Sequence, residues 1–411
     1  MFKQQQSASA SLNSKYKSQI TIAIDPVISV VHFYKIDNAD KSTIKCTDKN
    51  FKARPFSDAF IEEFTEIVKN YAQGNPSVGD AGITLVLPDR AVAMDAISVP
   101  TMKKRKSTEA IDTAISGLYR NLDKLQMNKY LALSNKQLTT FSLSSINTDL
   151  ITAIKGACSI GGMFPQHITF RANTTVFAAE YINAKLRNAS YLLLDIKKDS
   201  TCYSFVAKGR LTGFYDMPYG YNIIKDNTVV SEDMLIDHSI SELVVLNAKE
   251  KAKAKQLTMM RDTEEPTDTE EGFEETEEDL EDPTNMNLGV QATNYKKLPK
   301  KQPRKLPKFM LRPTPETKEG FEYENFRIFI KWALDLIQSN EKLTMQGMPE
   351  IIYVNMPDKF EHLIETTNLE KDENKFEFAM LDTKEKGVIR GNLELYGGFC
   401  SMSSGRYHTF S

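Results

Sequence analysis

Two aspartates that follow short apolar segments are the residues of this chain best placed to do chemistry. Asp25 ends one such segment and Asp195 ends another, whereas a third, Ile351 to Val354, ends in Asn355-Met356. Loops that follow strands can bind phosphate through backbone N–H groups, and they use glycine where a side chain would collide with the ligand. None of the three loops contains a glycine. The pattern therefore predicts that these three loops are poorly suited to a close approach of phosphate.

No competing catalytic motif is present. The chain has no Ser-His-Asp or Cys-His set and no HExxH, Walker A or GxGxxG sequence. Its four cysteines form no CxxC pair and have no zinc-site spacing, so we expect reduced thiols and no metal site. His32 is the one histidine near a candidate site, and we interpret it as a structural strand residue.

Length and composition indicate a globular protein with two cores. The chain has 411 residues, of which 41% are hydrophobic and 26% charged. The net charge of −3 gives no basic field, so we expect no nucleic-acid partner. No apolar run approaches the roughly 20 residues that cross a bilayer, so we expect a cytoplasmic protein that reaches a membrane only through a partner.

The order of elements predicts an α/β first domain with an insertion. Strand and helix periodicities alternate over residues 19–100 and 163–188, including a helix from about Ser57. Between them, residues 101–162 have the pattern of a small α-β-β-α subdomain. Residues 1–18 are rich in Gln, Ser and Lys, and we expect a disordered tail there.

A second α/β domain is predicted over residues 189–257 and 321–405. It opens with three strands and contains a helix from about 231 to 255. The interruption at 258–320 has low complexity. Residues 262–282 hold thirteen acidic and no basic side chains, and residues 296–308 hold seven basic ones. Such a segment buries too little apolar area to offset chain entropy, so we expect a disordered acidic-then-basic linker.

Two α/β domains, each with an Asp at the end of its first strand, are typical of the actin-like ATPase superfamily. The small insert, Ile97-Ser98-Val99-Pro100 and the turn Gly161-Gly162-Met163-Phe164-Pro165 resemble its PilM and FtsA branch. The carboxyl end lacks an FtsA-type amphipathic helix, which favours the type IV pilus assembly protein PilM. The resemblance covers about residues 18–255 and 320–405. It implies a two-domain actin-like, ribonuclease H-like fold.

The resemblance also implies which residues would line the nucleotide cleft. The family places a glycine two residues after each strand-end Asp, where this chain has Val27 and Lys197, and a Gly-Gly pair under the adenosine. It implies that Asp25 and Asp195 would hold Mg²⁺ through water if ATP bound. The degenerate cleft would comprise Asp25, Ser29, His32, Asp195, Lys197, Ser200, Thr201, Asn355 and Met356. We expect no catalytic residue and no cofactor, with ATP and magnesium as the alternative.

Function is expected to lie in partner binding. PilM holds a cytoplasmic peptide of an inner-membrane pilus protein between its first domain and the insert, and the resemblance places Val92, Met94, Ile97 and Val99 along that groove. We expect an adaptor for a pilus or secretion protein, with homo-oligomerisation open and little or no ATPase activity. The alternatives are a divergent ATP-binding filament protein, and an FtsA-like adaptor that contacts anionic lipid through residues 296–308.

Overall fold

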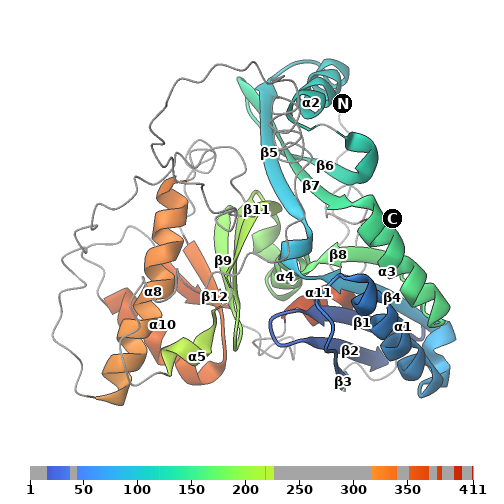
Figure 1. The fold of residues 1–411 in the computed structure, drawn as a ribbon. Coiled ribbons are helices and arrows are strands. Elements are labelled where there is room, and N and C mark those ends of the chain that lie inside the picture. The colour runs from blue at the N-terminus through green and yellow to red at the C-terminus, as the bar shows by residue number, and fades with distance from the viewer. Residues whose placement is uncertain are drawn as a thin grey trace, which may run out of the picture.

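Two lobes and a small subdomain make up the computed structural model (Figure 1). It describes residues 16–37, 44–119, 121–217, 219–225, 317–339, 351–369, 377–381, 393–399 and 410. Residues 1–15 of the expected tail, the helix predicted at 231–255, most of the acidic-basic linker and the basic block at 296–308 lie outside these residues. Among the described residues, no helix combines the length and apolarity needed to span a membrane.

The first lobe is built on a five-stranded sheet with the order β3-β2-β1-β4-β8. Its strands are β1 (Ser18–Asp25), β2 (Val30–Asp37), β3 (Ile44–Asn50), β4 (Ala81–Leu87) and β8 (His167–Phe170). β1 pairs antiparallel with β2 and parallel with β4. Because Ser18 is buried in β1, the predicted tail boundary at 18 is one residue too late.

Two helices pack together on the first lobe, α1 (Asp58–Gln73) and α3 (Thr148–Ile160). The predicted start of α1 is confirmed, because the Ser57 side chain accepts the Phe60 N–H at 3.2 Å and caps the helix. Phe60 and Phe64, one helical turn apart, both point into the core.

The second lobe repeats this plan with the order β11-β10-β9-β12-β13. Its strands are β9 (Tyr191–Ile196), β10 (Thr201–Ala207), β11 (Arg210–Met217), β12 (Ile351–Asn355) and β13 (Glu377–Met380). Its helices are α5 (Tyr221–Ile224), α8 (Lys318–Ser339) and α10 (Glu361–Leu369). α8 begins at 318, so the predicted restart of order at 321 is slightly late.

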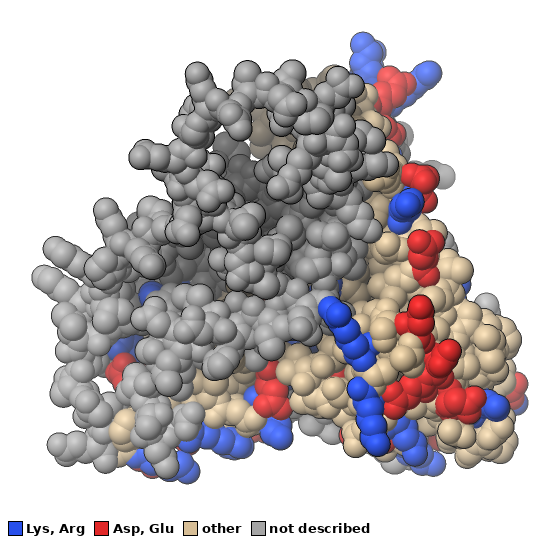
Figure 2. Space-filling view, viewed as in Figure 1, with Lys and Arg blue, Asp and Glu red and all other residues tan. Residues whose placement is uncertain are grey.

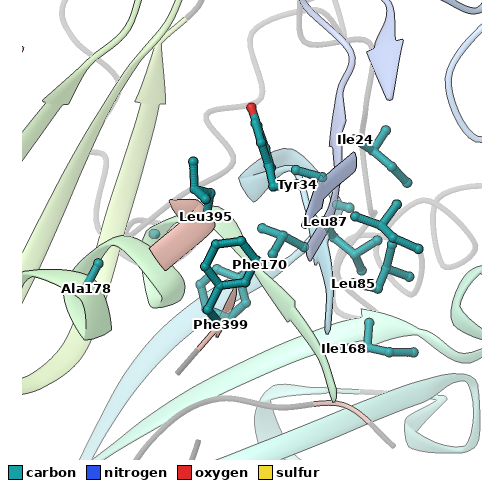
Figure 3. Packing of buried hydrophobic residues seen from close by; sticks show 14 of the residues in the cluster. Ile24, Tyr34, Leu85, Leu87, Ile168, Phe170, Ala178, Leu395 and Phe399 are labelled. Carbon is teal, nitrogen blue, oxygen red and sulfur yellow. The ribbon is translucent and has the colours of Figure 1, made fainter. Parts of the chain in front are cut away.

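Two helices lie between the lobes (Figure 1): α4 (Arg171–Ile182) follows β8, and α11 (Leu393–Phe399) follows the strands of the second lobe. α11 returns to pack on α4 and on β1. Figure 3 shows Phe170, Leu395 and Phe399 beside Leu85 and Leu87 of β4, and all five belong to one continuous core. The pair therefore ties the two lobes together.

The small subdomain has boundaries different from those predicted. The order α-β-β-α is confirmed, with α2 (Lys104–Leu118), β6 (Leu125–Ser134), β7 (Leu138–Asn147) and then α3. However, β5 (Ala93–Pro100) pairs with β7 and belongs to this sheet, whose order is β5-β7-β6. α3 belongs to the first lobe, because Ile151, Ile154 and Cys158 enter its core. The placement of β5 and α3 therefore contradicts the predicted limits 101–162.

Short 3-10 helices complete the described fold: η1 (Pro76–Asp80), η2 (Asp89–Ala91), η3 (Leu122–Lys124), η4 (Ala184–Asn188) and η6 (Asp358–Phe360). η2 matters for the site, because it follows β4 and turns the chain toward the start of α4. Figure 2 shows acidic and basic side chains mixed over the exposed face of the first lobe, in keeping with the low net charge.

Candidate functional site

The first predicted loop, between β1 and β2, uses its carboxylate for its own turn. Asp25 Oδ1 accepts the N–H groups of Val27 at 3.0 Å and Ile28 at 3.4 Å. Ser29 closes the turn with a φ of 56°, in the left-handed region. Two N–H groups that could face a phosphate are therefore already satisfied by Asp25.

Asp195, at the end of β9, is buried and held by an arginine that the sequence analysis did not select. Arg171 Nε and Nη2 both donate to Asp195 Oδ2, at 3.0 and 2.8 Å, and Nη2 also donates to the Asp195 carbonyl oxygen at 3.1 Å. Because Arg171 opens α4 after first-lobe strand β8, this forked contact joins the two lobes.

Electrostatics keeps the Arg171 guanidinium charged. Burial by itself would lower the Arg171 pKa, but the neighbouring Asp195 carboxylate holds that pKa well above its usual value. The third nitrogen, Nη1, donates to Ser200 Oγ at 2.8 Å and lies 3.9 Å from Asp216 Oδ1. Each guanidinium nitrogen therefore has an acceptor in the second lobe.

The third predicted loop completes the environment of Asp195. Asn355 ends β12 beside Asp195 in parallel register, and its Nδ2 donates to Asp195 Oδ1 at 2.7 Å. Met356 follows with a fully buried side chain in the second-lobe core. Both carboxylate oxygens of Asp195 are thus engaged, and Met356 packs with core side chains rather than facing the cleft.

Lys197, in the turn between β9 and β10, is engaged by α11. Its Nζ pairs with Glu394 Oε1, a buried carboxylate. The turn itself is tight, because Lys197 N–H donates to the Ser200 carbonyl oxygen at 2.8 Å. Gly220 lies against this turn, where a Cβ atom would stand 2.0 Å from the Lys197 carbonyl oxygen. The turn is therefore packed between α11 and the chain before α5.

Beside these contacts lies a cavity of about 30 Å³. It has room for one or two water molecules. Its walls come from both lobes and from α11: Ala23, Ile24, Asp25, Pro26, Val27, His32, Val86, Leu87, Pro88, Asp89, Arg171, Lys197, Ser200, Asp216 and Glu394. Three of these residues already have partners within the protein: Asp25 in its own turn, Arg171 on Asp195 and Lys197 on Glu394.

Four of the nine predicted cleft residues line this cavity: Asp25, His32, Lys197 and Ser200. His32 pairs through Nδ1 with Asp48 Oδ1 at 2.8 Å and stacks on Tyr34, which fits a structural strand residue. The other five, Ser29, Asp195, Thr201, Asn355 and Met356, lie outside the cavity wall. Thr201 is buried and donates to the Tyr219 carbonyl oxygen at 2.7 Å.

The predicted groove residues are core residues. Val92 and Met94 lie in the first-lobe core, each 3% exposed. Ile97 and Val99 lie under α2 in the core of the small subdomain, at 9% and 6%. The prediction that these four side chains line a groove is therefore wrong. The apolar run was long because β5 crosses from one core into another and is covered on both faces.

Sequence reasoning missed Arg171 and the charged groups around it: Asp89, Arg90, Asp216 and Glu394. Arg171 had a usable signal, because it is the first helical residue after a buried strand. Asp89 and Arg90 follow β4, and Asp216 lies near the end of β11. All three therefore have a position near a strand end, the feature by which Asp25 was chosen. Glu394 had no signal in its local sequence.

Comparison with known proteins agrees with this architecture. No family model and no curated protein sequence matches the chain. Among solved structures it is similar to a PilM-PilN type IV pilus biogenesis complex, with a TM-score of 0.52 and 11% identity over 94% of this chain and 98% of that one. This similarity confirms the predicted PilM-like, two-domain actin-like fold. At such identity it shows the fold alone.

Weaker similarities to other solved structures are also found. The ADP-bound MreB5 of Spiroplasma citri gives a TM-score of 0.38 at 10% identity over 92% of this chain and 94% of that one. The ethanolamine utilization protein EutJ from Carboxydothermus hydrogenoformans gives 0.37 at 8% identity over 93% and 89%. At TM-scores below 0.5, neither supports a further conclusion.

Proposed function

We propose that this chain is an actin-like adaptor that works by binding a membrane-associated partner and has no ATPase activity. The observation that supports this most is the pairing of Arg171 with Asp195 across the cleft. Arg171 comes from the first lobe and contacts the Asp195 carboxylate, which would have to hold magnesium if ATP were bound. The ion pair therefore holds the lobes together without a nucleotide.

The residues at the cleft do not fit magnesium-ATP. Asp195 has no free oxygen, and Asp25 Oδ1 is engaged by its own turn. Lys197 is paired with Glu394, and the cavity has room for one or two waters. Opening the cleft would break the buried ion pair of Arg171 and Asp195. The ligand would then have to replace the contacts that both charged groups lose.

We propose a cytoplasmic segment of an inner-membrane pilus or secretion protein as the partner. The support is the fold similarity to PilM, which is known in complex with PilN. The protein would then lie in the cytoplasm, against the membrane through that partner. Since the four predicted groove side chains are buried, the exposed apolar residues of the small subdomain, Met102 and Leu131, are the candidates for contact. They are 37% and 42% exposed.

Site-specific photo-crosslinking in native cells tests this proposal. A photoreactive phenylalanine analogue placed at Met102 or Leu131 should form a crosslink to a membrane protein that has a short cytoplasmic segment. The same analogue at Glu365, an exposed position on α10, should not form that crosslink. The crosslink should persist when cellular ATP is depleted. Crosslinks only between copies of this chain would contradict the adaptor function and favour a filament.

A further inference from the structure

Two carboxyl groups from opposite lobes, one buried and one largely buried, lie at the wall of the same cavity. Asp89 comes from η2 of the first lobe and is 1% exposed, and Asp216 comes from β11 of the second lobe, with its side chain 9% exposed. Neither residue takes part in the contact between Arg171 and the Asp195 carboxylate. Their place at the junction of the lobes makes their charge state relevant to cleft opening.

Each of these carboxyl groups has one engaged oxygen and one without a hydrogen bond among the described residues. Asp89 Oδ1 accepts the Ala172 N–H at 2.7 Å and so caps the start of α4, but its Oδ2 has no hydrogen-bond partner. Asp216 Oδ2 accepts Arg90 Nε at 3.0 Å, while its Oδ1 has none and lies 3.9 Å from Arg171 Nη1. If both carboxyl groups were charged, these two oxygens would carry negative charge without a hydrogen-bond donor.

The charge balance around the cavity favours neutralisation of one of them. Three cationic side chains and five carboxyl groups lie around the cavity. Two of the cations are already paired, Arg171 with Asp195 and Lys197 with Glu394. The groups are Arg90, Arg171 and Lys197 against Asp25, Asp89, Asp195, Asp216 and Glu394. His32 also lines the cavity and pairs with Asp48, outside this set. Like charges held together away from water favour the uptake of a proton.

A metal ion is the less suitable counter-charge. In the part of the chain that the structure describes, no three side chains of His, Cys, Asp or Glu are arranged to hold one. A proton needs only one oxygen, and Asp89 Oδ2 is available for it.

The direction of titration agrees with the geometry. Burial first, and then the Asp216 carboxylate, raise the pKa of Asp89 to about 7, against lowering by Arg171, the Ala172 N–H and the Cys202 thiol. Burial also raises the pKa of Asp216, although Arg90 and Arg171 oppose it and Asp25 adds to it. Both shifts favour the protonated form in the closed cleft.

We propose that Asp89 carries a proton while the lobes are closed and releases it when they separate, so that cleft closure depends on pH near neutrality. Separation would move Asp216 away and admit water, which restores an ordinary acidic carboxyl. The coupling goes beyond the adaptor function and does not depend on partner binding.

The sign follows from proton uptake on closing. The closed state binds more protons than the open state between the ordinary carboxyl pKa and about 7, so closure is favoured as the pH falls through 7. Above 7 the dependence ends, because Asp89 is charged in both states. Going from pH 8 to pH 6 should raise the ratio of closed to open molecules about tenfold.

Electron-spin distance measurements between the lobes of the full chain test this. Labels at Lys69→Cys on α1 and Glu365→Cys on α10, both exposed, report lobe separation once Cys46 and Cys400 are serine. The wild-type background should show a rising short-distance population from pH 8 to pH 6. Asp89→Asn, whose amide oxygen can still accept the Ala172 N–H, should stay closed at both pH values.

Glu62→Gln, an exposed carboxyl change on α1, is the matched control and should keep the wild-type response. A wild-type distance distribution that is the same at pH 6 and pH 8 would overturn the proposal, even if Asp89→Asn fails to fold. So would an unchanged pH response in folded Asp89→Asn. A response to added Mg²⁺ at constant pH, without a response to pH, would assign the free oxygens to a cation instead.

Discussion

Replacing Arg171 with alanine should lower the free energy of unfolding by about 3–5 kcal/mol. The change removes three hydrogen bonds to Asp195, two of them to its carboxylate, and one to Ser200 Oγ. It leaves Asp195 Oδ2 buried in the second lobe without its cationic partner. Because removal of one member of a buried pair strands the other charge, the loss should exceed that of any surface pair.

Chemical denaturation followed by circular dichroism measures this effect. Arg105→Ala is the matched control, since Arg105 also pairs with a carboxylate, Glu109, but lies on the exposed side of α2. It should change stability by no more than about 0.5 kcal/mol. Equal losses in the two variants would mean that the Arg171 contact does not hold the lobes together.

The second large effect is expected at Gly397, where α11 crosses α4. A Cβ atom there would stand 2.0 Å from the Thr174 carbonyl oxygen and 2.6 Å from its carbonyl carbon. Because these are backbone atoms of a buried helix, relief requires the helices to move apart. Gly397→Ala should therefore reduce the free energy of unfolding by about 1–3 kcal/mol, despite the better helix propensity of alanine.

Gly117→Ala supplies the comparison for Gly397. Gly117 lies within α2, and a Cβ atom there meets nothing within 4 Å. The same chemical change should stabilise the chain by up to about 1 kcal/mol, because alanine is the better helix former. Thermal melts of the two variants should move in opposite directions. A Gly397→Ala melt at or above that of the wild type would contradict the close crossing of α4 and α11.

Strand ends were the part of the site that sequence reasoning could reach. The apolar runs before Asp25 and Asp195 predicted β1 and β9, and these strands occupy matching places in the two sheets. The missing glycines predicted a poor phosphate site, which stays a prediction; in the structure the two turns make hydrogen bonds to their own polar groups. Local pattern was sufficient here because each feature depends on neighbours in the sequence.

What sequence reasoning missed depends on contacts between distant segments. Arg171 lies 24 residues before Asp195, with no local sign that the two would meet across a cleft. Asp89 faces Ala172 from 83 residues away. The error at Val92, Met94, Ile97 and Val99 has the same origin, because an apolar strand does not reveal which core covers it.

Isothermal titration calorimetry of the wild-type chain with ATP and Mg²⁺ tests the central claim most directly. Because Arg171, Lys197 and their partners occupy the cleft, we expect no binding heat up to about 1 mM nucleotide. Any binding would then have a free energy weaker than about −4 kcal/mol. ATP hydrolysis should equal the buffer rate. Binding below about 10 µM, at about −7 kcal/mol, together with hydrolysis lost in Asp195→Asn, would contradict the account.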